Sequence, residues 1–275
     1  SVMVYGNIGV WLTDSTLNNF EDMNIGFPSG IDNRKINKII KYNNSLYAGT
    51  LYGLFAYNQE SKEWEKQQLL LKEEHVVDMY TKGDTLHVML RSHLLITKNG
   101  KHFYEVNLPE PAGYDNKIGL FKTLWVLHSG EIYGDFGIMV VDLIGIVMVF
   151  MSITGFILYL SKENIKNKKN SQEIRRKHSK RYRWNIKWHN KIGWITIIFL
   201  FVNTTAGMFL RPPLLAAIFT SKVAKIPYTE LDTPNAWYDI LRRGIYMPED
   251  DIHIISTYDG FYYKPDNFTT IRRFD

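Results

Sequence analysis

A basic segment lies between two long apolar runs, and this arrangement constrains the fold more than any other feature of the chain. The segment covers residues 161–191, and the runs on either side cover residues 138–160 and 192–210. It carries twelve Lys and Arg against two acids, Glu163 and Glu173. A helix of about 20 apolar residues can cross a bilayer, and short connections rich in Lys and Arg stay in the cytoplasm. The pattern therefore predicts a transmembrane hairpin with a cytoplasmic basic connection.

The charge of the chain is unevenly distributed. The whole sequence has 33 Lys and Arg against 28 Asp and Glu, a net charge of +5, whereas residues 161–191 alone carry +10. The rest of the chain is therefore mildly acidic, with a net charge of −5. A uniformly basic chain would favour nucleic acid, but here the positive charge is placed to face anionic lipid headgroups. We expect the lipid bilayer as a partner and no nucleic acid.

The hairpin is predicted as two helices, residues 138–160 and 188–210, joined by a basic cytoplasmic loop at residues 161–187. The first helix would be about 35 Å long, which is enough for a hydrocarbon core of about 30 Å. An amphipathic segment at residues 116–137 is expected at the outer membrane–water boundary. The alternative is a buried helical hairpin in a soluble protein. Small residues that favour close packing of transmembrane helices recur in both runs: Gly145, Ser152, Gly155, Ala206 and Gly207.

The regions outside the hairpin, residues 1–115 and 211–275, contain short β-strand patterns at regular intervals. In three segments a short strand pattern is followed by a glycine or small polar residue and then by a second short apolar stretch. Their anchor residues, Gly9, Gly53 and His93, are 44 and 40 residues apart. A period of about 40 to 45 residues with several short strands per unit is typical of β-propeller blades.

A fourth copy of the pattern, residues 252–263, follows the hairpin, so the hairpin interrupts the series of blades. Both flanks must then lie on the same side of the membrane, which a two-helix hairpin allows. We predict an α-helical transmembrane hairpin inserted in extracytoplasmic all-β propeller-like repeats. Closed rings have about four to eight blades, and the chain begins at Ser1 without a signal sequence. We therefore expect a longer polypeptide, with further transmembrane spans from the same chain or from a partner subunit.

The sequence lacks the patterns of several catalytic classes, and no catalytic residue can be assigned. Without cysteine it has no disulfides, thiolate metal ligands or cysteine nucleophiles. It has no phosphate-binding glycine loop, nucleophile elbow or His-Glu-x-x-His helix. His178 lies in the basic segment and is expected to be solvated. Five further histidines are scattered through the repeats without the spacing of metal ligands: His75, His87, His93, His102 and His253.

The membrane segments resemble the PepSY-associated transmembrane family over roughly residues 120–215. The family usually carries a small α/β module outside the cytoplasm, whereas this chain has blade-like repeats in that place. The motifs that carry the resemblance are Leu-His-Ser-Gly-Glu-Ile-Tyr-Gly at 127–134, Val-Asp-Leu-Ile-Gly at 141–145, Ser-Ile-Thr-Gly at 152–155, Trp-His-Asn-Lys-Ile-Gly at 188–193 and Thr-Ala-Gly-Met-Phe-Leu-Arg-Pro-Pro at 205–213.

This resemblance implies a cofactor and a cellular location. Members of the family include bacterial inner-membrane reductases of ferric siderophores, which hold b-type haem between helices. The resemblance therefore implies haem b with His128 and His189 as ligands of its iron, in an inner membrane with the bulk of the chain periplasmic. Neutral imidazoles suit haem iron, and histidine near a span is otherwise costly. The alternative is that both histidines lie at the interface, solvated or bonded to lipid phosphate, and anchor the helices.

In the predicted hairpin His128 lies at the outer face and His189 at the inner face, too far apart to share one iron. Each needs a partner ligand from another span, or the two mark separate haems on an electron path across the bilayer. The function implied is electron transfer to an extracytoplasmic acceptor such as a ferric chelate, with a ferric siderophore or a redox protein as partner. The alternative is a non-enzymatic, membrane-anchored propeller that serves as a binding, sensory or scaffold subunit of an envelope complex.

Overall fold

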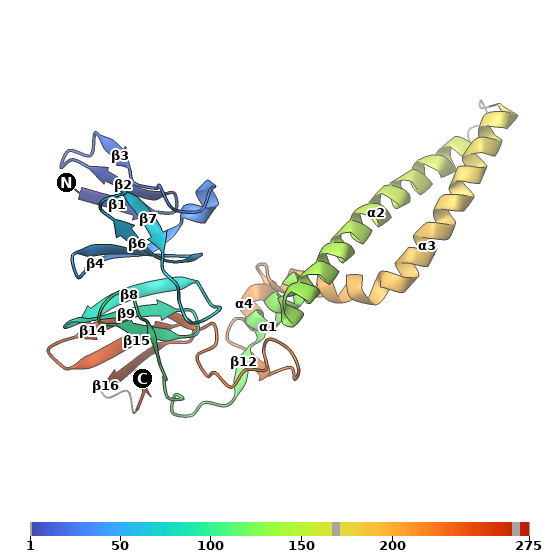
Figure 1. Ribbon diagram of the computed structural model, residues 1–275. Coiled ribbons are helices and arrows are strands. Elements are labelled where there is room, and N and C mark those ends of the chain that lie inside the picture. Colours follow the sequence, from blue (N-terminus) through green and yellow to red (C-terminus); the bar gives the residue numbers. More distant parts are fainter. Residues whose placement is uncertain (1, 167–170, 266–269, 275) are drawn as a thin grey trace. The chain divides into compact units, whose positions relative to one another are not determined.

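The chain forms two compact units (Figure 1). The first, here called the sheet unit, comprises Ser1–Tyr114 and Pro234–Asp275, and the second, the helical unit, comprises Asp115–Thr233. The segments before and after the helical unit therefore fold together, although the whole hairpin separates them in sequence. The structure is a computed structural model that describes all residues except 1, 167–170, 266–269 and 275.

The sheet unit consists of four antiparallel sheets in which strands that follow one another in the chain pair with each other. The first sheet contains β1 (Val2–Gly6), β2 (Gly9–Thr13) and β3 (Phe20–Asp22). The second contains β4 (Ile36–Tyr42), β5 (Ser45–Thr50), β6 (Gly53–Asn58) and β7 (Glu63–Lys66). The third contains β8 (Val76–Lys82), β9 (Thr85–Leu90), β10 (Leu94–Thr97) and β11 (Tyr104–Val106). The fourth contains β14 (Leu241–Met247), β15 (Ile252–Thr257), β16 (Phe261–Pro265) and β17 (Arg272–Arg273).

The repeated sequence segments form one hairpin in each sheet: β1–β2, β5–β6, β9–β10 and β15–β16. Gly9, Gly53 and Gly260 occupy the same place at the end of the turn, with φ of 117°, 134° and 146°. Only glycine adopts such angles at little cost, which explains the recurrence of glycine there. The third turn has His93 in this place. Among the described residues the four sheets do not close into a barrel or ring, so the propeller stays a prediction.

Three hydrophobic cores hold the sheet unit together, and each lies between two successive sheets. The two middle sheets therefore bury both faces, which explains why β8 and β9 are buried along almost their whole length. The core between the first and second sheets includes Val10, Ala48, Phe55 and Trp64. The core between the second and third includes Tyr42, Leu54, Met79 and Leu95. The core between the third and fourth includes Met89, Leu94, Leu241 and Ile255.

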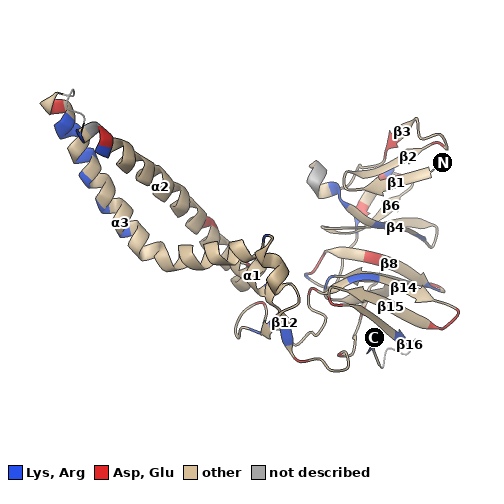
Figure 2. Ribbon diagram, turned by 180° about the vertical axis from the view of Figure 1, so that it is seen from behind, with Lys and Arg blue, Asp and Glu red and all other residues tan. Residues whose placement is uncertain are grey.

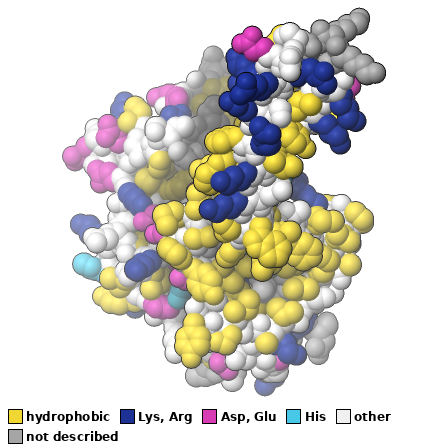
Figure 3. Space-filling view, turned by 90° about the vertical axis from the view of Figure 1, so that its right-hand side faces the viewer, with side chains coloured by type: hydrophobic (Ala, Val, Ile, Leu, Met, Phe, Trp, Pro, Cys, Tyr) yellow, Lys and Arg dark blue, Asp and Glu magenta, His cyan; other side chains and the backbone are white. Residues whose placement is uncertain are grey.

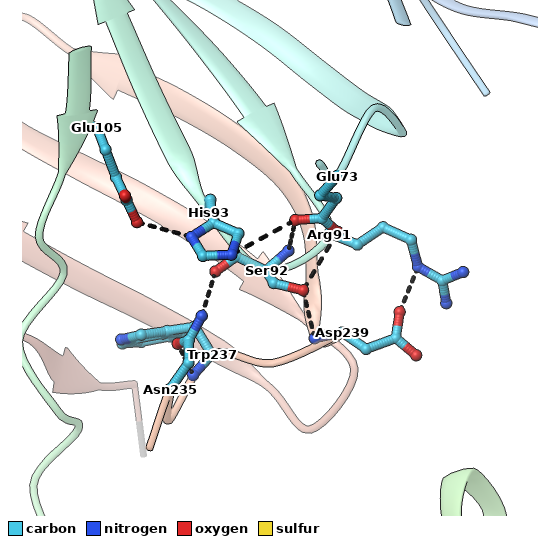
Figure 4. Close-up of polar contacts among 8 residues, drawn as sticks. All are labelled: Glu73, Arg91, Ser92, His93, Glu105, Asn235, Trp237 and Asp239. Atoms are coloured by element: carbon cyan, nitrogen blue, oxygen red, sulfur yellow. Dashed lines mark hydrogen bonds and ion pairs between the residues drawn. The ribbon is translucent and has the colours of Figure 1, made fainter. Parts of the chain in front are cut away.

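Hydrogen bonds fix the segment that enters the fourth sheet to the β9–β10 turn of the third sheet (Figure 4). Asn235 Nδ2 donates to the carbonyl oxygen of Ser92 at 2.9 Å, and the backbone N–H of Asp239 donates to Ser92 Oγ at 3.0 Å. The Asp239 carboxylate also forms an ion pair with Arg91. On its other side Ser92 N–H donates to Glu73, and burial raises the pKa of the Glu73 carboxyl. This network anchors the fourth sheet on the third.

The helical unit contains two long helices and several short elements. Its small sheet pairs the strand before the helices with the strand after them. In chain order the elements are β12 (Lys117–Gly119), α1 (Leu120–Ser129), the 3-10 helix η2 (Glu131–Tyr133), α2 (Gly134–Lys166), α3 (Gln172–Phe209), α4 (Leu214–Ile218) and β13 (Lys222–Ala224).

Both long helices can cross a membrane by length and composition. They contain 33 and 38 residues, which corresponds to about 50 Å and 57 Å against a hydrocarbon core of about 30 Å. Only 11% and 6% of the residues in their most apolar windows are buried, unlike the core helices of soluble proteins. Lys and Arg residues gather where α2 ends and α3 begins (Figure 2), and hydrophobic side chains follow along the helices (Figure 3).

The structure changes two predicted boundaries. The basic segment predicted as a loop at residues 161–187 is helical over most of its length, because Lys, Arg and Gln are good helix formers. Ser171 caps α3 by accepting a hydrogen bond from the backbone N–H of Ile174. The part at residues 167–170 lies outside the described residues. In addition, residues 211–233 belong to the helical unit and not to the blade-like flank, because β13 pairs with β12.

The buried His87 makes the stability of the sheet unit depend on pH. Its ring stacks on Tyr80 with 4.6 Å between centroids, and burial, helped by the nearby His253, lowers the pKa of His87 from 6.5 to about 4. The unfolded chain therefore binds more protons than the folded chain between pH 6.5 and pH 4. We expect His87 to reduce the free energy of unfolding by about 2 kcal/mol from pH 7 to pH 4.5. Urea unfolding followed by tryptophan fluorescence measures this change.

The variant His87→Phe keeps an aromatic ring on Tyr80 but removes the titrating group, so it should lose this part of the pH dependence. The matched control is His102→Gln, because His102 is an exposed histidine of the same unit. A His87→Phe protein with the wild-type dependence on pH would contradict the assignment.

Candidate functional site

His128 lies in the last turn of α1 and contacts α3 through its ring. Its Nδ1 is 3.0 Å from the carbonyl oxygen of Asn203, and Asn203 Nδ2 donates in return to the carbonyl oxygen of His128 at 3.2 Å. Because a carbonyl oxygen only accepts hydrogen bonds, Nδ1 must carry the ring proton. The other ring nitrogen, Nε2, then holds a free electron pair, which is the form of histidine that binds metals.

His189 contacts a different partner, on α2. Its Nδ1 is 2.8 Å from Thr154 Oγ1. The Thr154 hydroxyl has one proton and two carbonyl acceptors in its own helix, Phe150 at 2.8 Å and Met151 at 3.1 Å. When it donates to either, Oγ1 accepts from His189 Nδ1–H and the neutral ring keeps its electron pair on Nε2, as in His128.

The two histidines belong to separate places in the helical unit. The partner of His128 is Asn203, which lies 14 positions beyond His189 on α3, or about 21 Å along the helix axis. One metal ion cannot bind both side chains. Among the described residues no group of three or more His, Cys, Asp or Glu could hold a metal ion, so each site would offer a single imidazole.

Two of the predicted small residues lie beside these imidazoles. A Cβ added at Gly207 would lie 2.8 Å from His128 Cε1, so Gly207 makes room for that ring, whereas a Cβ added at Gly155 would be in ordinary van der Waals contact with His189 Cε1, at 3.5 Å. In contrast, nothing lies within 4 Å of a Cβ added at Gly145, so this glycine does not mediate helix packing in the described chain. The small-residue pattern thus marks the two histidine contacts more than a general helix–helix interface.

The residues of both places fit the ligation of haem iron. Histidines that bind metals usually donate their other ring N–H to a carbonyl, carboxylate or water, which fixes the tautomer and the ring orientation. The Asn203 carbonyl and the Thr154 hydroxyl have this role here. Sequence reasoning missed both residues. The signal was present, because each is a polar residue inside an apolar run, where such residues are costly.

Two long apolar helices with fixed imidazoles, joined to a unit of antiparallel sheets, define a membrane protein whose candidate site lies in its helices. A family model described as the PepSY-associated TM region matches residues 46–245. The match covers well over half of the 275 residues, and the chain belongs to this family. It extends beyond the residues that carry the motifs, roughly 120–215, into the second, third and fourth sheets. No curated protein and no solved structure matches the chain.

The fit between Gly207 and His128 can be tested with a pair of variants. Gly207→Leu would force a side chain into the imidazole and should destabilise the α1–α3 contact by about 1 to 3 kcal/mol. Gly145→Leu makes the same change in α2 where space is open, so it controls for the gain in helix propensity. Thermal unfolding in detergent should show a lower melting temperature for Gly207→Leu alone. Equal melting temperatures for the two variants would contradict the packing described here.

Proposed function

We propose that this protein is an inner-membrane b-type haem protein that transfers electrons across the membrane to an extracytoplasmic acceptor such as a ferric chelate. One observation carries the proposal: Nδ1 of both His128 and His189 lies within hydrogen-bond distance of an oxygen on a neighbouring helix, an arrangement in which the neutral ring presents the Nε2 electron pair to a metal. Interfacial anchoring, the alternative role for these histidines, needs no such contact.

Bound haem supplies reversible one-electron transfer through its iron. His128 and His189 would each provide one axial nitrogen. Because His189 and Asn203, the partner of His128, lie about 21 Å apart along α3, we propose two haems. Asn203 and Thr154 would orient the rings and keep the ring proton away from the ligating nitrogen. We propose that the second axial ligand of each haem comes from another span of the same polypeptide or of a partner subunit.

We also propose an orientation for the protein. The basic end of the helix pair would face the cytoplasm, because positively charged connections are retained there. At their other ends, α2 is connected to the sheet unit through α1 and β12, and α3 is connected to it through α4 and β13. The sheet unit would then be periplasmic. Its four sheets, with a repeated turn and a core between each successive pair, support its assignment as part of a β-propeller.

Absorption spectroscopy of the purified protein tests the haem proposal. We expect the full chain in detergent to show a Soret band and, after reduction with dithionite, the α band of b-type haem. His189→Ala should lose about half of the haem because one axial ligand is missing. The matched control is His178→Ala, which removes another histidine from α3 in its basic half and should keep the full spectrum. A wild-type protein without haem absorbance would leave the non-enzymatic, membrane-anchored binding or scaffold subunit as the function.

The orientation can be tested because the chain has no cysteine of its own. Lys177→Cys introduces a thiol at the basic end of the helices, and Lys101→Cys introduces one in an exposed turn of the third sheet. In cells whose outer membrane has been removed, a membrane-impermeant maleimide should label Cys at position 101 directly. It should label Cys at position 177 only after the membrane is permeabilised. The reverse pattern would overturn the orientation.

A further inference from the structure

The first strands of three successive sheets carry the same irregularity. β4, β8 and β14 are each seven residues long, and each has a β-bulge near its start where it pairs with the next strand. The extra residues are Asn37, Val77 and Arg242. A bulge re-aims the neighbouring side chains and is frequent beside binding sites. Its recurrence in three sheets indicates that the residues after the bulges have a shared role.

The residues that follow the three bulges are Lys38, Asp78 and Arg243, and their side chains meet. Lys38 Nζ is 3.9 Å and Arg243 Nη1 is 3.7 Å from the same oxygen, Asp78 Oδ1. This meeting is possible because β8 contacts both β4 and β14. Figure 2 shows charged residues on the neighbouring strands β8 and β14. The central carboxylate therefore has a cation on either side, one from the second sheet and one from the fourth.

The Asp78 carboxylate forms no hydrogen bond with Lys38 or Arg243, so most of their N–H donors can still bind another group. It is buried and accepts hydrogen bonds from the backbone N–H groups of Met79 at 2.9 Å and Gly244 at 3.0 Å. The distances to the two cations are those of ion pairs and exceed hydrogen-bond lengths. The side chains of Lys38 and Arg243 are 39% and 59% exposed. In the described part of the chain, Lys38 Nζ donates no hydrogen bond, and Arg243 donates only through Nη1 to backbone carbonyls.

The surroundings of these side chains are positively charged. His75, next to the start of β8, has a pKa lowered from 6.5 to about 4, first by burial and then by the cation of Arg91. Arg242 and Lys35 lower it further, and Asp239 alone among the named charges opposes them. One carboxylate between two cations leaves a charge of +1 among the three side chains at the bulges.

We propose that Lys38 and Arg243 form a binding site for a small oxyanion, a carboxylate or phosphate group, across the first strands of the sheet unit. Both nitrogens lie within 3.9 Å of one Asp78 oxygen, so they are close enough together for a single small anion to bridge them from their exposed side. Guanidinium and ammonium groups are the donors that carboxylates and phosphates bind in proteins. Asp78 positions the two cations and weakens the site by its own charge. The site is independent of haem.

Calorimetric titration of the full chain in detergent, at low ionic strength, tests this site. Citrate is the carboxylate probe and inorganic phosphate is the phosphate probe, and we expect at least one of them to bind. Lys38→Gln and Arg243→Gln should each weaken binding at least tenfold. Asp78→Asn keeps the shape of the side chain and removes the competing negative charge, so it should strengthen binding. Thermal unfolding of each variant confirms that it is folded.

Lys41→Gln is the matched control, because Lys41 is an exposed lysine on the same strand as Lys38. It should bind the anion as the wild type does. The inference is overturned if neither citrate nor phosphate binds the wild-type protein. It is equally overturned if Lys41→Gln weakens binding as much as Lys38→Gln, because binding would then follow net charge alone.

Discussion

The contact between β8 and β14 is the interaction on which the rest of the sheet unit depends. It joins the third sheet, which precedes the helices in the chain, to the fourth sheet, which follows them, and it brings the two backbones very close. A Cβ added at Gly244 would lie 2.6 Å from the ring of Tyr80, so glycine is required for this approach. The backbone N–H of Gly244 donates to the buried Asp78 carboxylate. Because the fourth sheet packs on the third, the chain between them must leave the sheet unit and return to it.

A pair of antiparallel helices meets that requirement. α2 and α3 pack against each other, and β12 pairs with β13 at the end where the chain enters and leaves the helical unit. A hairpin of this kind returns a chain to the side of a membrane from which it came. Because the helices come in a pair, the chain returns to the side from which it started. The sheets before and after the helices can therefore pack together.

The candidate site shows how an apolar helix can hold a polar side chain in a defined state. His128 and His189 each contact an oxygen on a neighbouring helix, and Gly207 clears space beside the His128 ring. The cost of a polar group in an apolar segment is offset by these hydrogen bonds. The anion site proposed for the sheet unit is built differently. There, β-bulges in three strands bring three charged side chains to one place.

Much of this architecture could be predicted from the sequence. The helices follow from the length of the apolar runs, and the hairpins of the sheets follow from the recurrence of Gly9 and Gly53 in alternating apolar segments. The ends of the helices could not be predicted from hydropathy, because Lys and Arg continue a helix as well as apolar residues do. The role of Asn203 and Thr154 also escaped prediction, since a polar residue in an apolar run marks a costly position but does not identify its partner on another helix.

The sequence by itself determined the existence of the membrane hairpin, its basic end and the repeated strand pairs. These are local properties, because hydrophobic length, charge and turn geometry act between residues that are close in the chain. Only the tertiary structure decided that residues 234–275 complete a unit begun by residues 1–114, that His128 meets Asn203, and that Lys38, Asp78 and Arg243 converge. The reason is physical: contacts between distant segments depend on how whole elements pack, and no short stretch of sequence encodes them.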